Sequence, residues 1–177
     1  VPRPSDAQGR KIVQRGFRPG RVPPDVAGRR FFGQGAIRKV TVDRIDPVWV
    51  HGRGADPRFE TLRSSTAVVL GCGSVGAPIA LALAKAGVGK LILVDEKPLK
   101  AANLGRHPLG VGSIGRPKAT ELATRIRRDL PHPRVEPIVG PVENLVDQLP
   151  EVLLQANVIV SALGDWPAEA LLDEWSE

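Results

Sequence analysis

From Thr66 onward, the hydrophobic residues of the chain fall into short apolar runs that alternate with longer amphipathic stretches. A short apolar run that ends at a turn residue is typical of a buried parallel strand, and a longer stretch with helical spacing is typical of a covering helix. Strands are therefore predicted at 66–71, 90–95, 134–139 and 157–162. Helices are predicted at 74–87, where Gly87 is the stop, and at 113–130 and 142–156. We expect an α/β protein with a doubly wound parallel sheet, covered by helices on both faces.

The sequence before the first of these strands is less regular. Residues 36–45 alternate in a way that predicts a strand, and 46–62 predict a loop that Trp49 and Phe59 anchor against the body. Because the strand and helix alternation stops after its fourth strand, we expect the domain to be incomplete at its C-terminus. We therefore divide the chain into a basic linker or tail rich in Gly and Pro (1–35), a strand and loop lead-in that packs on the core (36–63), and an α/β domain (64–177).

Charge and cysteine content narrow the possible functions. The 177 residues carry a net charge of +6, and the excess lies in residues 1–30, which hold eight Arg or Lys against two Asp. This basic run, in which Phe17 is the single aromatic residue, is not the folded basic face that nucleic-acid binding requires. The single cysteine, Cys72, excludes an internal disulfide and a metal site built on thiolates. No segment has the roughly 20 apolar residues of a membrane span, so we expect a soluble protein in the cytoplasm.

A glycine-rich turn joins the first predicted strand to the first predicted helix. Its sequence, GCGSVG, matches the G-x-G-x-x-G pattern at Gly71, Gly73 and Gly76. The first glycine permits a tight turn, the second lets phosphate approach the backbone, and the third lets helix and strand pack closely. Asp95 ends the next strand, 19 residues after Gly76, where a carboxylate can accept hydrogen bonds from both ribose hydroxyls. The sequence therefore predicts a nucleotide-binding site, with Cys72 as a small structural residue of the turn.

The residues after Asp95 bear on whether the nucleotide is ATP or a dinucleotide. An enzyme that splits ATP between its α- and β-phosphates needs cations and amides that converge on the phosphates. Asn103, Arg106 and Lys118 follow the second strand in that order. Lys118 falls in the first turn of the next predicted helix, where a cation opposes the helix dipole and suggests a bound anion. Asp165 follows the fourth strand at the carboxyl edge of the sheet and is a candidate Mg²⁺ ligand.

These residues lie in a segment that resembles a known family. The sequence VVLGCGSVGAPIALALAKAGVGKLILVDEKPLKAANLGRH, followed by IGRPKA, is similar to the ThiF/MoeB family, which includes the ubiquitin-activating enzymes. The resemblance covers residues 64–165, and the positions that match the family pattern are Asp95, Asn103, Arg106 and Lys118. The stretches VDRIDPVWVHGRG and NLGRH are also similar to a bacterial branch in which this domain is fused to other modules, such as a ubiquitin-conjugating-like module.

The resemblance implies a Rossmann-like sheet of the ThiF type and a specific activity. Members of the family use ATP and Mg²⁺ to adenylate the C-terminal glycine carboxylate of a ubiquitin-like or sulfur-carrier protein, usually as dimers or pseudodimers. By this resemblance Asp95 binds the ribose and Asp165 holds Mg²⁺. The catalytic residues that contact the phosphates are then Asn103, Arg106 and Lys118.

Three positions depart from the family pattern. Lys97 stands where a second Asp is common, His107 stands where Gln is usual, and LGDW replaces Thr-Asp-Asn around Asp165. A transfer cysteine, in members that form thioesters, would lie beyond Glu177. Two other functions stay open from the sequence: an NAD-dependent oxidoreductase, and a catalytically silent ThiF-like partner subunit that keeps the fold but binds another chain.

Overall fold

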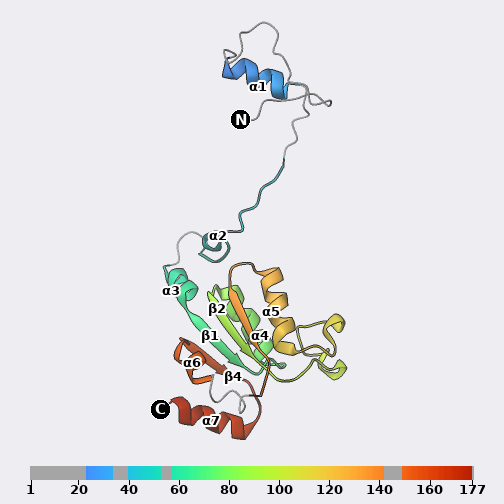
Figure 1. Ribbon diagram of the computed structural model, residues 1–177, viewed down its shortest axis with the longest axis vertical. Helices are drawn as coiled ribbons and strands as arrows, with labels where there is room; N and C mark the ends of the chain where they lie inside the picture. The colour runs from blue at the N-terminus through green and yellow to red at the C-terminus, as the bar shows by residue number, and fades with distance from the viewer. Residues whose placement is uncertain (1–22, 34–39, 53–56, 142–148, 177) are drawn as a thin grey trace. The chain divides into compact units, whose positions relative to one another are not determined.

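The chain divides into two compact units, Val1–Asp43 and Arg44–Glu177, in a computed structural model (Figure 1). The structure describes residues 23–33, 40–52, 57–141 and 149–176. In the first unit the described residues form one helix, α1 (Pro24–Phe32). The sequence pattern did not predict this helix, although Pro24 stands at its first position, where the fixed φ of proline favours a helix start.

The second unit contains a four-stranded parallel sheet in the order β3-β2-β1-β4. Its strands confirm the four that the sequence predicted: β1 (Thr66–Leu70), β2 (Lys90–Val94), β3 (Arg134–Ile138) and β4 (Val158–Ser161). In register, Ala67 of β1 pairs with Leu91 of β2 and with Val158 of β4. The chain runs outward from β1 to β3 and then crosses back, so that β4 lies on the other side of β1. Ligands of open α/β sheets bind at the carboxyl edge, where the strand order reverses in this way.

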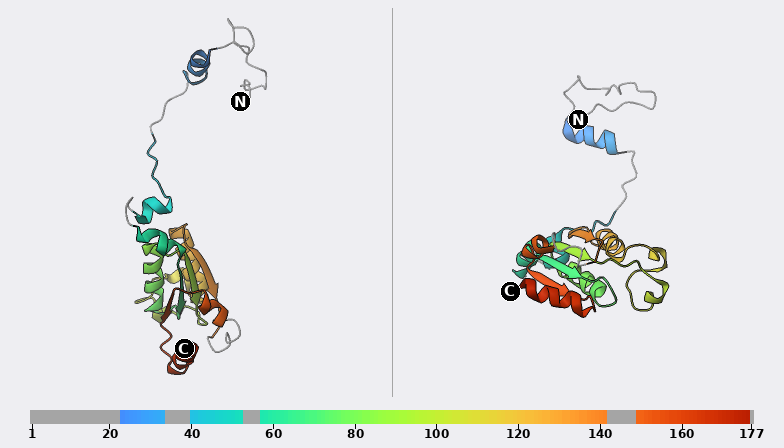
Figure 2. Two further views of the ribbon diagram at one scale, coloured as in Figure 1. Left: turned by 90° about the vertical axis from the view of Figure 1, so that its left-hand side faces the viewer. Right: turned by 60° about the horizontal axis from the view of Figure 1, so that its bottom comes forward.

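Helices cover both faces of the sheet, as predicted (Figure 2). α4 (Gly76–Ala86) and α5 (Lys118–Asp129) pack on one face, and α6 (Leu149–Leu154) and α7 (Trp166–Ser176) pack on the other. Successive residues of the strands serve the two cores, since Val69 belongs to the first and Val68 to the second. Both side chains are fully buried, and each such burial contributes roughly 1.5–3 kcal/mol. No helix in the described ranges is long and apolar enough to cross a membrane.

The ends of α4, α5 and α6 agree only in part with the predicted helices. α4 ends at Ala86, and the next residue, Gly87, has the left-handed φ of 100° that the predicted stop requires. The helix predicted at 113–130 was wrong at its start, because α5 begins at Lys118. Pro117 precedes it in an extended conformation, with ψ 127°, and proline disfavours a helical residue before itself. Of the helix predicted at 142–156, residues 149–154 are helical and 142–148 lie outside the described residues.

The lead-in to the sheet differs from the prediction. Residues 40–45 form no strand, so the strand predicted at 36–45 is wrong for them, and 36–39 lie outside the described residues. The loop predicted at 46–62 contains two short helices instead, α2 (Pro47–Gly52) and α3 (Arg58–Ser64). Phe59 is buried as predicted, but Trp49 is 57% exposed and therefore is not an anchor.

His51 takes the anchoring role that was predicted for Trp49. Its ring stacks on Phe59 with 6.1 Å between ring centroids, and its Nδ1 lies 3.1 Å from the carbonyl oxygen of Lys85 at the end of α4. A carbonyl can only accept, so Nδ1 carries the proton in this contact. A Cβ at Gly87 would lie 3.2 Å from the same ring. His51 thus connects Phe59 of α3 to the C-terminus of α4.

Candidate functional site

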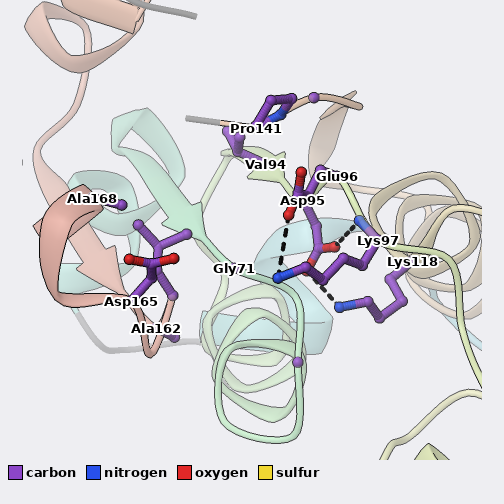
Figure 3. A pocket seen from close by; sticks show the side chains of 13 residues that line it. Gly71, Val94, Asp95, Glu96, Lys97, Lys118, Pro141, Ala162, Asp165 and Ala168 are labelled. Carbon is purple, nitrogen blue, oxygen red and sulfur yellow. Dashed lines mark hydrogen bonds and ion pairs between the residues drawn. The ribbon is translucent and has the colours of Figure 1, made fainter. Parts of the chain in front are cut away.

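A pocket opens at the carboxyl edge of the sheet, where β1, β2 and β4 end (Figure 3). The predicted site residues that line it are Gly71, Gly73, Asp95, Lys118 and Asp165. Gly76 belongs to the first turn of α4, and neither Asn103 nor Arg106 lines the pocket. The parallel topology therefore brings together groups from three separate loops, because all the strands end at the same edge.

Asp95 is the most highly connected side chain of the pocket. Its Oδ2 accepts hydrogen bonds from the backbone N–H of Cys72 and from Lys118 Nζ, both at 2.8 Å, and its Oδ1 accepts from the N–H of Lys97 at 2.7 Å. The residue is 8% exposed. Since all three partners are donors, the ionised carboxylate fits this position and its orientation is fixed.

Lys118 reaches the same carboxylate from the first residue of α5. Its N–H donates to the carbonyl of Lys97 at 3.2 Å, and its ammonium turns toward Asp95, as Figure 3 shows. The residue is 8% exposed, so the ion pair is buried. A cation at a helix N-terminus is unfavourable by itself. The carboxylate of Asp95 compensates for both the dipole and the burial.

The three glycines of the turn have different local requirements. Gly71 has a φ of +88°, and a Cβ there would lie 2.4 Å from the carbonyl oxygen of Ala162 after β4. A Cβ at Gly76 would lie 1.8 Å from the carbonyl oxygen of Gly71. A Cβ at Gly73 would meet nothing within 4 Å. The fold therefore requires the first and third glycines, while the second faces open space beside the pocket.

Asp165 lies across the pocket from Asp95 (Figure 3). Its backbone carbonyl accepts the N–H of Glu169 at 3.0 Å, and within the described ranges its carboxylate has no hydrogen-bond partner. A free carboxylate in a pocket would suit Mg²⁺ if a nucleotide were bound there, because Mg²⁺ takes one or two carboxylates together with phosphate oxygens and water. In the part of the chain that the structure describes, no cluster of three or more His, Cys, Asp or Glu could hold a metal by itself.

Lys97 adds a cation to the same pocket. Its ammonium lies 3.2 Å from a carboxylate oxygen of Glu96, and Figure 3 shows its side chain extending across the pocket. The Glu96 carboxylate, with smaller contributions from Asp95 and Asp165, raises the pKa of Lys97. A positive charge therefore stands at the position where a second Asp is common in the family pattern.

Asn103 and Arg106 belong to the turn that follows β2. The Asn103 side chain accepts a hydrogen bond from the backbone N–H of Lys100 at 2.9 Å. This contact lies at the N-terminus of the 3₁₀ helix η1 (Ala101–Asn103). The guanidinium of Arg106 is exposed and donates to the carbonyl of Ala102 at 3.1 Å. In this arrangement the two side chains hold their own turn, and their roles toward phosphate stay predictions.

His107 is a buried side chain beside the glycine turn that was not among the predicted site residues. It is 7% exposed, and its Nε2 lies 2.8 Å from the carbonyl oxygen of Cys72 in the glycine turn. Its position directly after Arg106, where the family usually has Gln, was the available signal. The imidazole connects the turn after β2 to the turn after β1.

The thiol of Cys72 is expected to be inert in the folded protein. Burial raises its pKa to about 12, the negative charge of Asp95 adds to the effect, and Lys118 opposes it. At pH 8 the thiolate fraction is then on the order of a thousandfold below that of a free cysteine. Reaction with a thiol-specific disulfide reagent should be very slow in the native state and fast in guanidinium chloride. Rapid labelling of the native protein would contradict this environment, and the signal is unambiguous because Cys72 is the single cysteine.

The strand order, the glycine turn and the acid at the end of β2 define a Rossmann-like α/β domain. Residues 51–177 match the model of the ThiF family, and the chain belongs to that family. It is 33% identical over 138 residues to the SAMP-activating enzyme E1 of Haloferax volcanii, covering 77% of this chain and 47% of that protein. It is 32% identical over 152 residues to the ATP-dependent ubiquitin transferase-like protein Cap2 of Pseudomonas aeruginosa, covering 80% and 27%.

A third relative and a solved structure extend the comparison. The sulfur carrier protein adenylyltransferase of Thermus thermophilus is 30% identical over 116 residues, covering 65% of this chain and 42% of that protein. The chain thus spans less than half the length of each of these three relatives. E. coli tRNA N6-threonylcarbamoyladenosine dehydratase, solved in complex with ATP, superposes with a TM-score of 0.63 at 23% identity, covering 75% of this chain and 57% of that one. At that identity the likeness shows the fold alone.

Proposed function

We propose that the chain carries the ATP site of an adenylyltransferase that activates the C-terminal carboxylate of a ubiquitin-like or sulfur-carrier protein. Family membership supports this, as do the names of the relatives from Haloferax volcanii and Thermus thermophilus. The observation that carries the proposal is the buried pair of Asp95 and Lys118 beside an open glycine turn. The pair places in one pocket a carboxylate that can accept hydrogen bonds from ribose and an ammonium that can bind phosphate.

Binding of ATP is expected to rearrange this pair. A carboxylate offers about four acceptor positions, and three donors already occupy Asp95. Two ribose hydroxyls therefore require one donor to leave. Two of the donors are backbone N–H groups in fixed turns, whereas the Lys118 ammonium is on a flexible side chain. We expect Lys118 to turn from Asp95 to the phosphates when the ribose takes its place.

The reaction requires positioning and charge stabilisation more than proton transfer. The carrier's carboxylate is already anionic at neutral pH, and it attacks the α-phosphorus while the bond to the β-phosphate breaks and pyrophosphate leaves. The N–H groups at the start of α4 and the Lys118 ammonium stabilise the negative charge of the phosphates. Asp165 would hold Mg²⁺, which, when bound, screens the same charge.

The proposal is tested by ATP–pyrophosphate exchange with ubiquitin-like and sulfur-carrier proteins from the same genome. Exchange should require Mg²⁺ and one carrier, and it should disappear when the C-terminal glycine of that carrier is deleted. Isothermal titration with ATP and with NAD is the companion measurement. Tight NAD binding without a metal requirement, together with no exchange, would contradict adenylation and favour an oxidoreductase.

The position of Arg106 favours one second candidate, a catalytically silent ThiF-like partner. Its guanidinium is hydrogen-bonded within its own turn and does not line the pocket. If the protein adenylates, Arg106 must reach the phosphates, and Arg106→Ala should lower the exchange rate about 100-fold or more without loss of fold. Arg128→Ala, at an exposed arginine of α5, is the matched control. A silent partner would bind ATP or another chain and give no exchange in any variant.

The assembly is also part of the proposal. We expect a homodimer or a pseudodimer with a related subunit, because the resemblance to the ThiF/MoeB family implies one. Mass measurement in solution decides between these and a monomer.

A further inference from the structure

Two successive peptide groups of the glycine turn are each held by one side chain. The peptide between Gly71 and Cys72 is held through the Cys72 N–H, which donates to Asp95 at 2.8 Å. The peptide between Cys72 and Gly73 is held through the Cys72 carbonyl, which lies 2.8 Å from Nε2 of His107. Asp95 has an expected role toward ribose, whereas His107 has none in the proposed reaction.

The hydrogen bonds of His107 determine its tautomer. The backbone N–H of Leu109 lies 3.1 Å from Nδ1, and a backbone N–H can only donate. Nδ1 is therefore the acceptor, and the proton of the neutral ring is on Nε2, where it donates to the Cys72 carbonyl. At 7% exposure, water does not readily replace either bond.

The bond to the Cys72 carbonyl also orients the N–H of Gly73. A trans peptide is planar, so its C=O and N–H point in opposite directions, and the described residues contain no cis peptide. Fixing the carbonyl toward His107 therefore turns the Gly73 N–H away from it. Gly73 lines the pocket, and its N–H has no partner within the described part of the chain. This donor is available to a ligand.

We propose that His107 is a positioning residue that aims the Gly73 N–H at a phosphate group of the bound nucleotide. The inference rests on the proposed nucleotide site and adds to it the group that orients its glycine turn. The position requires one donor and one acceptor on a single short side chain. The amide of glutamine supplies both, whereas methionine has a similar size and lacks the donor.

The test compares His107→Gln with His107→Met in the full chain. Isothermal titration measures the affinity for ATP, and ligand-detected NMR measures the affinity for adenosine, which lacks phosphate. His107→Met should bind ATP about tenfold more weakly or worse, since a hydrogen bond to a charged group is misdirected. Its adenosine affinity should change less than twofold. His107→Gln should stay within about threefold of the wild type for both ligands.

Each outcome decides the inference. ATP binding by folded His107→Met at wild-type strength would overturn it, and so would equal loss of adenosine and ATP affinity, because a general structural role predicts the latter. If circular dichroism shows that His107→Met does not fold, the Gly73 amide resonance is followed in the wild type. That resonance must shift on saturation with ATP, and His107→Gln must still bind; failure of either overturns the inference. A wild type that binds no ATP would contradict the proposed function itself.

Discussion

Replacing Asp95 with asparagine is expected to destabilise the protein by about 3–5 kcal/mol, because it leaves the buried Lys118 ammonium without its partner. The groups around the carboxylate are all donors. An asparagine amide must turn its NH₂ toward at least one of them, whichever way it is oriented. Guanidinium chloride unfolding measures the loss, and isothermal titration should detect no ATP binding.

Two companion variants separate the buried charge from the ligand contact. Adding Lys118→Met to Asp95→Asn removes the unpaired ammonium, so stability should largely recover while ATP binding does not. Asp165→Asn changes an exposed carboxylate of the same pocket and should alter the free energy of unfolding by less than about 0.5 kcal/mol. Unchanged stability in Asp95→Asn would show that the ion pair is not a significant part of the fold.

Alanine at Gly76 should destabilise the protein by about 3 kcal/mol, at the upper end of the usual overpacking effect. The new Cβ would lie 1.8 Å from the carbonyl oxygen of Gly71. The obstacle is backbone in a tight turn with φ +88°, so it cannot rotate away as a side chain would. Thermal or guanidinium unfolding provides the measurement, and a loss below about 0.5 kcal/mol would mean that α4 can move away from the turn without penalty.

Alanine at Gly73 is the matched control in the same turn, with the opposite expectation. Its Cβ meets nothing within 4 Å, so stability should change by less than about 0.5 kcal/mol. The methyl group projects into open space beside the pocket, where the proposal places a phosphate, and ATP affinity should fall about tenfold or more. Normal ATP binding by Gly73→Ala would mean that no phosphate approaches this residue.

The sheet and most of the pocket were predictable because local signals agreed with the long-range topology. The two central strands, β1 and β2, are buried on both faces and therefore read as continuous apolar runs. Once the strands are parallel, Asp95 and Asp165 must lie at the same edge as the glycine turn. The start of α5 could also have been placed better, because Pro117 is a recognised boundary signal.

The remaining features depend on contacts that a linear pattern does not contain. Residues 40–45 alternate like a strand but are exposed and pair with no described strand, since alternation alone does not supply a sheet edge. The direction of Arg106 is set by a local carbonyl, and that of His107 by the distant Cys72 carbonyl. Spacing predicted that these side chains follow Asp95, but it does not determine which way each one points.

The position of β4 links the stability of its pairing with β1 to the binding of a molecule in the pocket. Among the described strands it pairs with β1 alone, yet the residues that follow it form one wall of the pocket. A molecule that fills the pocket contacts that wall and the end of β2 together, so part of its binding free energy stabilises the association of β4 with the rest of the sheet. This coupling is reciprocal. If binding of the molecule favours the pairing of β4 with β1 by some factor, then separation of β4 from β1 lowers the affinity for the molecule by the same factor.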